Sequence, residues 1–318
     1  MKTARRRNRY RSHLQRRRPG RCRYDRSLKG GITMRNDTVM VIGTGQMGSG
    51  IAQVCAQAGY NVYMHDVSAE QIQKGMKRVS DQLVKQAEKG KMPHQDVKQI
   101  YQRLSPSASL EDAGEAFLII EAAVEQMDIK KEIFKRLDDI TGHSAILASN
   151  TSSLSITELA SVTNKPQNVI GMHFMNPVPV MELVEVIRGL ETSDQTYETV
   201  VAAAEKLNKV PIEVHDFPGF ISNRILMPMI NEAVFALYEG IAEKESIDGI
   251  MKLGMNHPMG PLALADLIGL DTCLYIMETL HKGFGDDKYR PCPLLKQYVS
   301  AGRLGKKTGK GFYTYEAT

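Results

Sequence analysis

His173 and Glu185 are the two residues of this sequence best placed to move a proton. His173 follows the apolar run Val169–Met172, and Glu185 lies inside the apolar run Leu183–Ile187. A carboxylate with two apolar neighbours on each side is costly to bury without a partner, and an imidazole on an adjacent strand would be a natural one. A histidine near neutral pH can take a hydroxyl proton as hydride leaves an alcohol carbon. The pattern therefore predicts a His–Glu acid/base pair.

A glycine-rich turn near the N-terminus has the spacing of a dinucleotide-binding site. The β-branched run Thr38–Ile42 precedes the pattern GTGQMG, and apolar residues at helical spacing follow it. Gly43 allows a tight turn, Gly45 lets the backbone approach a pyrophosphate, and Gly48 lets the helix pack closely on the strand. Free N–H groups at the helix N-terminus would bind the phosphates. The surrounding strand and helix make a glycine-rich turn without function the weaker interpretation.

Asp66 indicates which dinucleotide this site should prefer. It ends the second predicted strand, Tyr60–His65. Its distance from the glycine motif is close to the spacing of about 20 residues at which an acid binds the adenosine ribose. An acid there repels a 2′-phosphate, and no arginine occurs in the following Val67–Ala69. The sequence therefore favours NAD over NADP. With this site upstream, an acid/base role for His173 is favoured over that of a simple core histidine.

The order of the apolar runs predicts an α/β fold with a Rossmann-type, mostly parallel sheet. Two further buried strands are expected at Phe117–Ala123 and Ile146–Ser149, with a helix that starts near Asp128 between them. Ligands gather at the carboxyl ends of strands in such sheets. Glu125 and the polar run 150–153 follow these strand ends. Capping of the helix predicted near 156 explains only one hydroxyl of that run.

A long basic helical segment follows Asp66 and precedes the next predicted strand. It carries seven cationic side chains: Lys74, Lys77, Arg78, Lys85, Lys89, Lys91 and Lys98. From the residues alone, a solvated helix pair is the favoured interpretation. A lysine-lined arm that binds the phosphate-bearing tail of a substrate is the functional alternative.

The remaining part of the chain predicts a smaller, all-helical domain. Residues 210–219 are expected to form the linker between domains. Helices are expected over three ranges: Ile221–Tyr238, Ile247–Leu253 and Leu262–Leu280. Asn223 lies near the start of the first of them. We therefore divide the chain into residues 1–33, a disordered Arg-rich extension, residues 34–217, the dinucleotide-binding domain, and residues 218–318, the helical domain.

Charge and cysteine content exclude several function classes. Residues 1–35 hold 14 of the 41 basic residues and one of the 36 acids, so the rest of the chain is acidic. We expect no nucleic-acid partner for this acidic part of the chain. For the N-terminal extension, an upstream segment outside the fold is the favoured interpretation, and a targeting or RNA-contacting tail is the alternative. No apolar run is long enough for a membrane span. Four cysteines without a Cys-x-x-Cys pair indicate no metal site and fit a cytoplasmic location.

The segments that carry these residues resemble the L-3-hydroxyacyl-CoA dehydrogenase family. The similar segments are VIGTGQMGSGIA, SNTSSLSIT from Ser149, GMHFMNPVPVMELVEVI from Gly171, PGFISNRIL from Pro218 and KKTGKGFY from Lys306. The resemblance covers about residues 37–315 and leaves the Arg-rich extension outside. His173 and Asn176, spaced in this way from Glu185 and followed by Asn223, form a specific combination.

The resemblance implies an NAD-dependent enzyme that interconverts an (S)-3-hydroxyacyl-CoA, such as 3-hydroxybutyryl-CoA, and a 3-ketoacyl-CoA, such as acetoacetyl-CoA. It implies a catalytic His173–Glu185 pair. Ser152 and Asn223 would hold the C3 oxygen of the substrate, and Asn176 would lie in the same site. The predicted cofactor contacts are Gly43, Gly45, Gln46, Met47, Gly48, Asp66, Glu125, Lys130, Asn150, Ser152 and Asn176. The family's helical domain forms a homodimer, and its basic helical arm helps to bind CoA.

Three other kinds of protein share part of the pattern. Dehydrogenases of the 3-hydroxyisobutyrate and 6-phosphogluconate type share the glycine motif but use a catalytic lysine on a helix, which this chain replaces with the His/Glu pair. An L-gulonate-type dehydrogenase has the same motifs, so a substrate assay must separate it. A non-catalytic NAD-binding structural protein would bind cofactor without turnover. The intact set of His173, Glu185, Ser152 and Asn223 argues against this last class.

Overall fold

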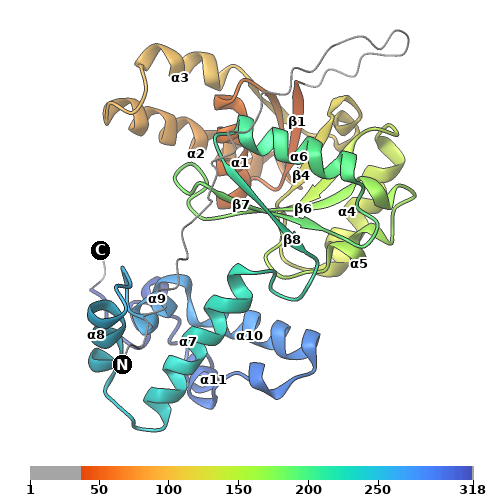
Figure 1. The fold of residues 1–318 in the computed structure, drawn as a ribbon. Coiled ribbons are helices and arrows are strands. Elements are labelled where there is room, and N and C mark those ends of the chain that lie inside the picture. Colours follow the sequence, from red (N-terminus) through yellow and green to blue (C-terminus); the bar gives the residue numbers. More distant parts are fainter. Residues whose placement is uncertain (1–36, 317–318) are drawn as a thin grey trace, which may run out of the picture. The chain divides into compact units, whose positions relative to one another are not determined.

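The computed structural model describes residues 37–316 of the chain (Figure 1). The Arg-rich extension predicted for residues 1–33 lies outside the described residues. Among the helices that the structure describes, none is long and apolar enough to cross a membrane.

One eight-stranded sheet forms the centre of the first part of the described chain, in the strand order β3-β2-β1-β4-β5-β6-β7-β8. All neighbouring pairs are parallel except β6–β7, which is antiparallel. The predicted mostly parallel sheet is therefore confirmed. The strands are β1 (Thr38–Ile42), β2 (Asn61–His65), β3 (Leu104–Ser107), β4 (Leu118–Glu121), β5 (Ile146–Ser149), β6 (Val169–Phe174), β7 (Leu183–Arg188) and β8 (Val210–His215).

Helices cover both faces of this sheet, because its strands carry apolar side chains on both sides. Val39 and Val41 of β1 face a core shared with α1, α2, α3 and α6, whereas Met40 and Ile42 face a core shared with α4 and α5. These helices are α1 (Gln46–Gln57), α2 (Ala69–Glu88), α3 (His94–Tyr101), α4 (Met127–Ile140), α5 (Ile156–Ala160) and α6 (Asp194–Lys206), with the short 3-10 helices η1 (Leu110–Glu115) and η2 (Pro166–Asn168).

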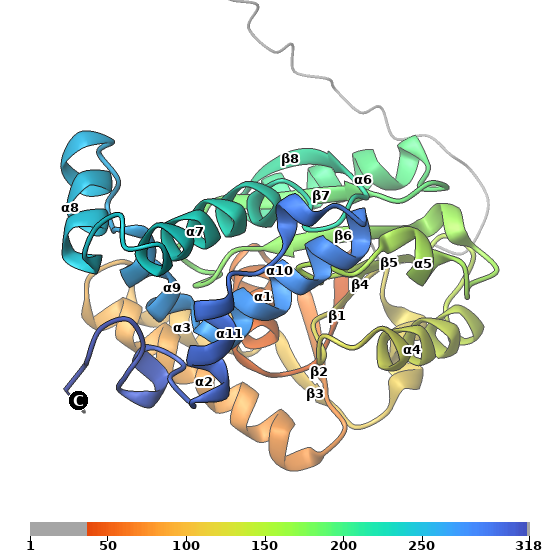
Figure 2. The ribbon, with the colours of Figure 1, turned by 90° about the horizontal axis from the view of Figure 1, so that it is seen from below.

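The C-terminal part is helical (Figure 2). It has an apolar core of its own. Its elements are α7 (Ser222–Tyr238), α8 (Lys244–Gly254), α9 (Pro261–Ile268), α10 (Leu270–Phe284) and α11 (Pro293–Ser300), with η3 (Asp287–Tyr289) and η4 (Lys306–Thr308). The single helix predicted over Leu262–Leu280 is wrong. Gly269 interrupts it with a φ of +105°, a backbone conformation that glycine adopts easily.

The two edge strands of the sheet differ from the sequence-based expectation. Residues 210–219 were expected to form the linker between domains, but 210–215 form β8, parallel to β7. Strand β3 was not predicted at all. Both strands contain a proline, Pro211 and Pro106. Strand β8 is largely exposed and β3 is half exposed, so their apolar pattern is weak. A proline is tolerated in an edge strand because its missing N–H can face away from the ladder.

Candidate active site

His173 and Glu185 face each other across the antiparallel pair β6–β7. They are register partners, and His173 Nδ1 lies 2.7 Å from Glu185 Oε2. The two residues are 7% and 2% exposed. Met172 and Phe174 on either side of the histidine pack into the core on the opposite face. The predicted contact is confirmed, and since Nδ1 is engaged, Nε2 is the ring nitrogen that remains for a substrate.

The carboxylate of Glu185 also anchors the start of α7. Oε1 accepts hydrogen bonds from the backbone N–H of Ile221 at 3.2 Å and of Ser222 at 2.9 Å. Oε2 accepts one from Ser222 Oγ at 2.6 Å. Burial raises the pKa of Glu185, but the hydrogen bonds from His173 and Ser222 outweigh it and lower the pKa below its ordinary value. Glu185 is therefore ionised at neutral pH.

Ser152 follows β5 in a turn that a second carboxylate holds. Glu125 Oε1 accepts hydrogen bonds from Thr151 Oγ1 at 2.5 Å, Ser152 N at 2.9 Å and Ser153 Oγ at 3.3 Å. Asn223 Nδ2 donates to the Ser152 carbonyl at 3.0 Å. The structure thus brings together two residues, Ser152 and Asn223, that lie 71 positions apart in the sequence.

Asn150 and Lys130 were predicted to contact the cofactor, but both side chains are buried. Asn150 Oδ1 accepts the Phe174 N–H at 2.9 Å, which ties the end of β5 to β6. Lys130 is fully buried, and its Nζ donates to Glu121 Oε1 at 2.6 Å and lies 3.5 Å from Glu125 Oε2. This placement favours an indirect role for Lys130, through Glu125.

The three motif glycines have the distinct surroundings that the sequence predicted. Gly43 has a φ of +88°, and a Cβ there would lie 2.5 Å from the Ala122 carbonyl oxygen. A Cβ on Gly48 would lie 1.7 Å from the Gly43 carbonyl oxygen, whereas one on Gly45 would meet open space. Helix α1 begins beside this space with no side-chain cap and no acid in its first turn. A pyrophosphate fits here, because the open helix N-terminus offers free N–H donors.

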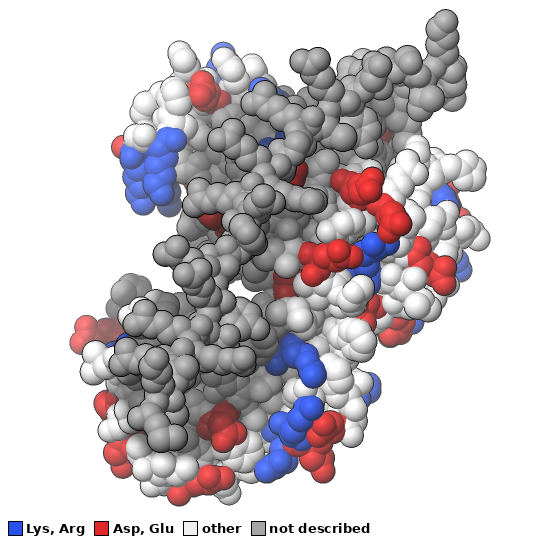
Figure 3. All heavy atoms as spheres, in the orientation of Figure 1, with Lys and Arg blue, Asp and Glu red and all other residues white. Residues whose placement is uncertain are grey.

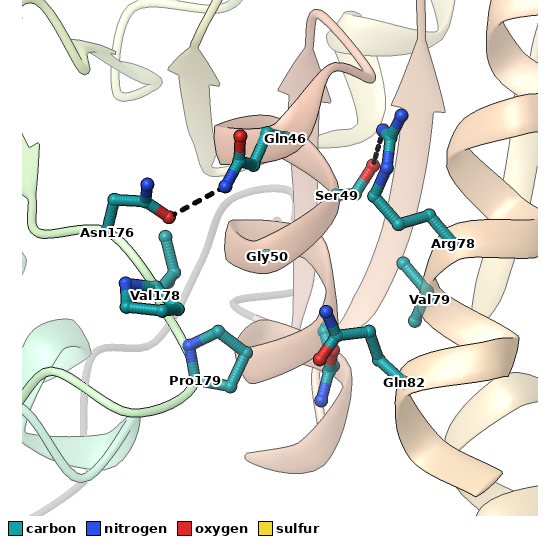
Figure 4. Close-up of a pocket in the computed structure, with 11 residues that line it drawn as sticks. Gln46, Ser49, Gly50, Arg78, Val79, Gln82, Asn176, Val178 and Pro179 are labelled. Atoms are coloured by element: carbon teal, nitrogen blue, oxygen red, sulfur yellow. Dashed lines mark hydrogen bonds between the residues drawn. The ribbon is translucent and has the colours of Figure 1, made fainter. Parts of the chain in front are cut away.

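Asp66 lies at the end of β2, beside the glycine turn. Its Oδ2 accepts hydrogen bonds from Thr44 N at 2.7 Å and Thr44 Oγ1 at 2.9 Å, and its Oδ1 from Val67 N at 2.8 Å. The guanidinium of Arg78 bonds instead to the Thr44 carbonyl at 3.0 Å. It also bonds to Ser49 Oγ at 3.2 Å (Figure 4). These bonds fix the carboxylate beside the glycine turn. A contact of Asp66 with the adenosine ribose stays a prediction of the sequence.

Gln46 and Asn176 meet across a small pocket between α1, α2 and the turn after β6 (Figure 4). Gln46 Nε2 lies 3.1 Å from Asn176 Oδ1. Lys209 stabilises this turn, because its buried ammonium donates to the carbonyls of Val178 at 2.6 Å and Met181 at 2.7 Å. Asn176 therefore reaches the helix end that carries the glycine motif.

Comparison with known proteins gives two family models that together match most of the chain. Residues 38–217 match the NAD-binding domain of 3-hydroxyacyl-CoA dehydrogenase, and residues 219–315 match its C-terminal domain. The chain belongs to the 3-hydroxyacyl-CoA dehydrogenase family.

Individual family members are similar over nearly their whole length. The chain is 63% identical to a probable 3-hydroxybutyryl-CoA dehydrogenase of Bacillus subtilis over 278 residues, which is 87% of this chain and 97% of that protein. It is 42% identical to the human mitochondrial hydroxyacyl-coenzyme A dehydrogenase over 285 residues, covering 87% and 91% of the two chains. The solved (S)-3-hydroxybutyryl-CoA dehydrogenase of Ralstonia eutropha matches with a TM-score of 0.87 at 52% identity, covering 88% and 99%.

NAD is the cofactor of this family member, and the open space at Gly45 gives a direct test of where it binds. We predict that Gly45→Ala raises the Kd for NADH about tenfold or more, because the new methyl group occupies the approach to the pyrophosphate. The fold should be unaffected, since that methyl group meets no protein atom within 4 Å. Isothermal titration calorimetry with NADH measures the effect.

Gly249→Ala is the matched control for this prediction. Gly249 lies in α8, and a Cβ there also meets nothing within 4 Å. Its affinity for NADH should equal that of the unchanged protein. Equal affinity in Gly45→Ala as well would show that the pyrophosphate does not pass Gly45.

Three residues that position the site were not singled out from the sequence. Ser222 bonds to Glu185, Glu121 bonds to Lys130, and Lys209 holds the Asn176 turn. Glu121 carried a usable signal, because it ends the apolar run of β4 just as Glu185 lies within that of β7. Ser222 and Lys209 carried no such signal, because the groups they bond to, in Glu185 and Val178, are distant in the sequence.

Proposed function

We propose that this dehydrogenase interconverts (S)-3-hydroxybutyryl-CoA and acetoacetyl-CoA with NAD(H), and that His173 is its general acid and base. The observation that carries the proposal is the buried His173–Glu185 bond next to a turn that joins Ser152 to Asn223. The domain limits of 34–217 for NAD binding and 218–318 for the helical part belong to the same proposal.

His173 works in both directions of the reaction. When bound, the nicotinamide supplies a hydride for the C3 carbon, or accepts one in the reverse direction. In reduction, the imidazolium gives its Nε2 proton to the C3 oxygen; in oxidation, the neutral imidazole takes that proton back. Glu185 accepts the Nδ1–H, which fixes the tautomer and stabilises the imidazolium.

Ser152 and Asn223 are proposed to hold the C3 oxygen. Ser152 is fixed through its backbone, since its N–H donates to Glu125 and its carbonyl accepts from Asn223. Among the described residues, no hydrogen bond engages the Ser152 hydroxyl, so it is available as a donor. A donor aimed at an oxygen on which charge develops lowers the barrier of the reaction.

The arm formed by α2 and α3 supports a CoA ester as the substrate. Figure 3 shows Lys and Arg side chains gathered in the region that these helices occupy in Figure 1. Its six lysines are exposed: Lys74, Lys77, Lys85, Lys89, Lys91 and Lys98. Lys74 pairs with Glu70 at 2.7 Å, and the others supply positive charge for the phosphates of CoA.

A homodimer is the proposed assembly. The apolar run Leu262–Ile268 is mostly internal, because Leu262 and Ala265 belong to the helical core. Other apolar side chains of this part are exposed, among them Ile241, Ile250 and Leu253. Exposed apolar patches of this kind mark interaction sites. Sedimentation equilibrium tests the assembly; a monomer at micromolar concentration would contradict it.

The experiment for the proposed function is a panel of substrates with NADH or NADPH. We expect turnover of acetoacetyl-CoA with NADH, little turnover of free acetoacetate, and weak activity with NADPH because of Asp66. Oxidation of L-gulonate in preference to the CoA ester would favour the alternative enzyme of the same superfamily. Binding of NADH without any turnover would favour a structural protein.

A cytoplasmic location is part of the proposal. The three described cysteines are free and buried, which agrees with such a location.

A further inference from the structure

Ser222 donates to the same oxygen of Glu185 that holds the catalytic histidine. Ser222 Oγ lies 2.6 Å from Oε2, and His173 Nδ1 lies 2.7 Å from it. The second oxygen, Oε1, accepts two backbone N–H groups from residues 221 and 222. The carboxylate therefore has four donors, and two of them share one oxygen.

Sharing one oxygen makes the two donors compete. Each O–H or N–H draws electron density from Oε2, so a hydrogen bond from Ser222 weakens Oε2 as an acceptor for the imidazole. The same bond favours the ionised carboxylate and contributes to the lowered pKa of Glu185. Ser222 thus reaches the histidine through the glutamate.

No further charged side chain is among the described hydrogen-bond partners of this pair. Glu185 bonds to His173 as its one ionisable partner among the described residues. The charged side chains on β7 and on adjoining elements contact other groups. Arg188 of β7 pairs with Asp194 and with Glu213 of β8. Asp216 binds the start of α5, and Lys209 binds two carbonyls. Arg224 of α7 lies over the Phe284 ring, and its buried Nη1 has no hydrogen-bond partner among the described residues. His215 of β8 is exposed.

We propose that Ser222 is a positioning residue of the reaction, whose hydroxyl lowers the proton affinity of the His173–Glu185 pair and so sets the pH range in which the enzyme works. This inference rests on the proposed role of His173 as acid and base. It goes beyond that role, because it assigns the control of proton affinity to the first residue of α7.

The sign of the effect follows from the acceptor. Removing the hydroxyl leaves Oε2 with more electron density for the Nδ1–H, which stabilises the imidazolium relative to the neutral ring. Reduction needs the imidazolium, so its rate should persist to higher pH. Oxidation needs the neutral imidazole, so its rise with pH should also move to higher pH. Both midpoints move upward together.

The test compares Ser222→Ala and Ser222→Thr in full pH profiles of kcat/KM for both directions. We expect Ser222→Ala to raise both midpoints by about half a pH unit, the scale of one weakened hydrogen bond. Threonine keeps the hydroxyl and should retain the original midpoints. If the alanine variant does not fold, Ser222→Cys replaces it, because a thiol is a weaker donor and shifts the midpoints in the same direction.

Ser155→Ala is the matched control. Ser155 Oγ donates to Asp216 Oδ2 at 2.8 Å, and that carboxylate accepts backbone N–H groups at the start of α5. This is the same serine–carboxylate arrangement at a helix start, without contact to His173. Its midpoints should match those of the unchanged enzyme.

The outcomes separate this inference from the proposed function. Unchanged or lowered midpoints in Ser222→Ala, or an equal shift in Ser155→Ala, would overturn the role of Ser222 while leaving the dehydrogenase assignment intact. Absence of activity in the unchanged protein would overturn the assignment itself. In that case an NMR titration of the His173 imidazole, assigned with His173→Gln, still measures whether Ser222→Ala raises its midpoint.

Discussion

Replacing His173 with glutamine should lower kcat for acetoacetyl-CoA reduction by about 10²-fold or more. Glutamine can still donate a hydrogen bond to Glu185, so the buried carboxylate keeps a partner and the fold should persist. It carries no transferable proton at the position of Nε2, and therefore the C3 oxygen must take its proton from water. Affinity for NADH should change little, since the glycine turn and Asp66 are untouched. Steady-state kinetics at saturating NADH measures the loss.

His215→Gln is the control for this substitution. His215 ends β8 and is exposed, and the variant tests whether loss of any histidine near this sheet edge matters. Its kcat should equal that of the unchanged enzyme. A His173→Gln variant that retains more than about a tenth of kcat would show that another group transfers the proton.

Replacing Lys130 with methionine should destabilise the protein by about 3–5 kcal/mol, the cost of leaving a buried carboxylate without its cation. Glu121 is fully buried and accepts hydrogen bonds from Lys130 Nζ at 2.6 Å, Ser149 Oγ at 2.6 Å and Ala123 N at 2.7 Å. Methionine has a similar length but no charge, so little packing is lost. Urea denaturation in the absence of NADH measures the change in the free energy of unfolding.

Two companion variants distinguish charge from packing at this position. Glu121→Gln combined with Lys130→Met removes both charges, and we expect it to recover part of the lost stability. Lys131→Met removes the neighbouring lysine, which pairs with Glu158 in a partly exposed bridge, and should cost no more than about 1 kcal/mol. A cost of the same small size for Lys130→Met would contradict a buried ion pair.

The sequence predicted those parts of the site that depend on local pattern. The glycine turn, Asp66 and the apolar strand around Glu185 are each defined within a few residues, and β1, β5 and the start of α7 lie within one residue of their predicted limits. The His173–Glu185 contact was predictable because a buried acid requires a partner. The same rule applied to Glu121 would have predicted that this acid also has a partner, which is Lys130.

The rest depends on contacts between distant segments. Strands β3 and β8 can contain Pro106 and Pro211 because both lie at an edge of the sheet, where a proline is tolerated. The local sequence pattern does not indicate which strands will lie at an edge. Ser222 meets Glu185 only because α7 starts beside β7, 37 positions along the chain. The helix break at Gly269 comes with its positive φ. The apolar residues on either side keep helical spacing, so the pattern did not indicate the break.

The most direct test of the central claim is the fate of a hydride label. The unchanged protein is incubated with acetoacetyl-CoA and NADH that carries deuterium at both C4 positions, and the product is analysed by NMR and mass spectrometry. We predict 3-hydroxybutyryl-CoA with one deuterium at C3, because hydride passes from the nicotinamide to the carbon whose oxygen His173 protonates. A product without deuterium at C3, or unchanged acetoacetyl-CoA despite bound NADH, would contradict the proposed reaction.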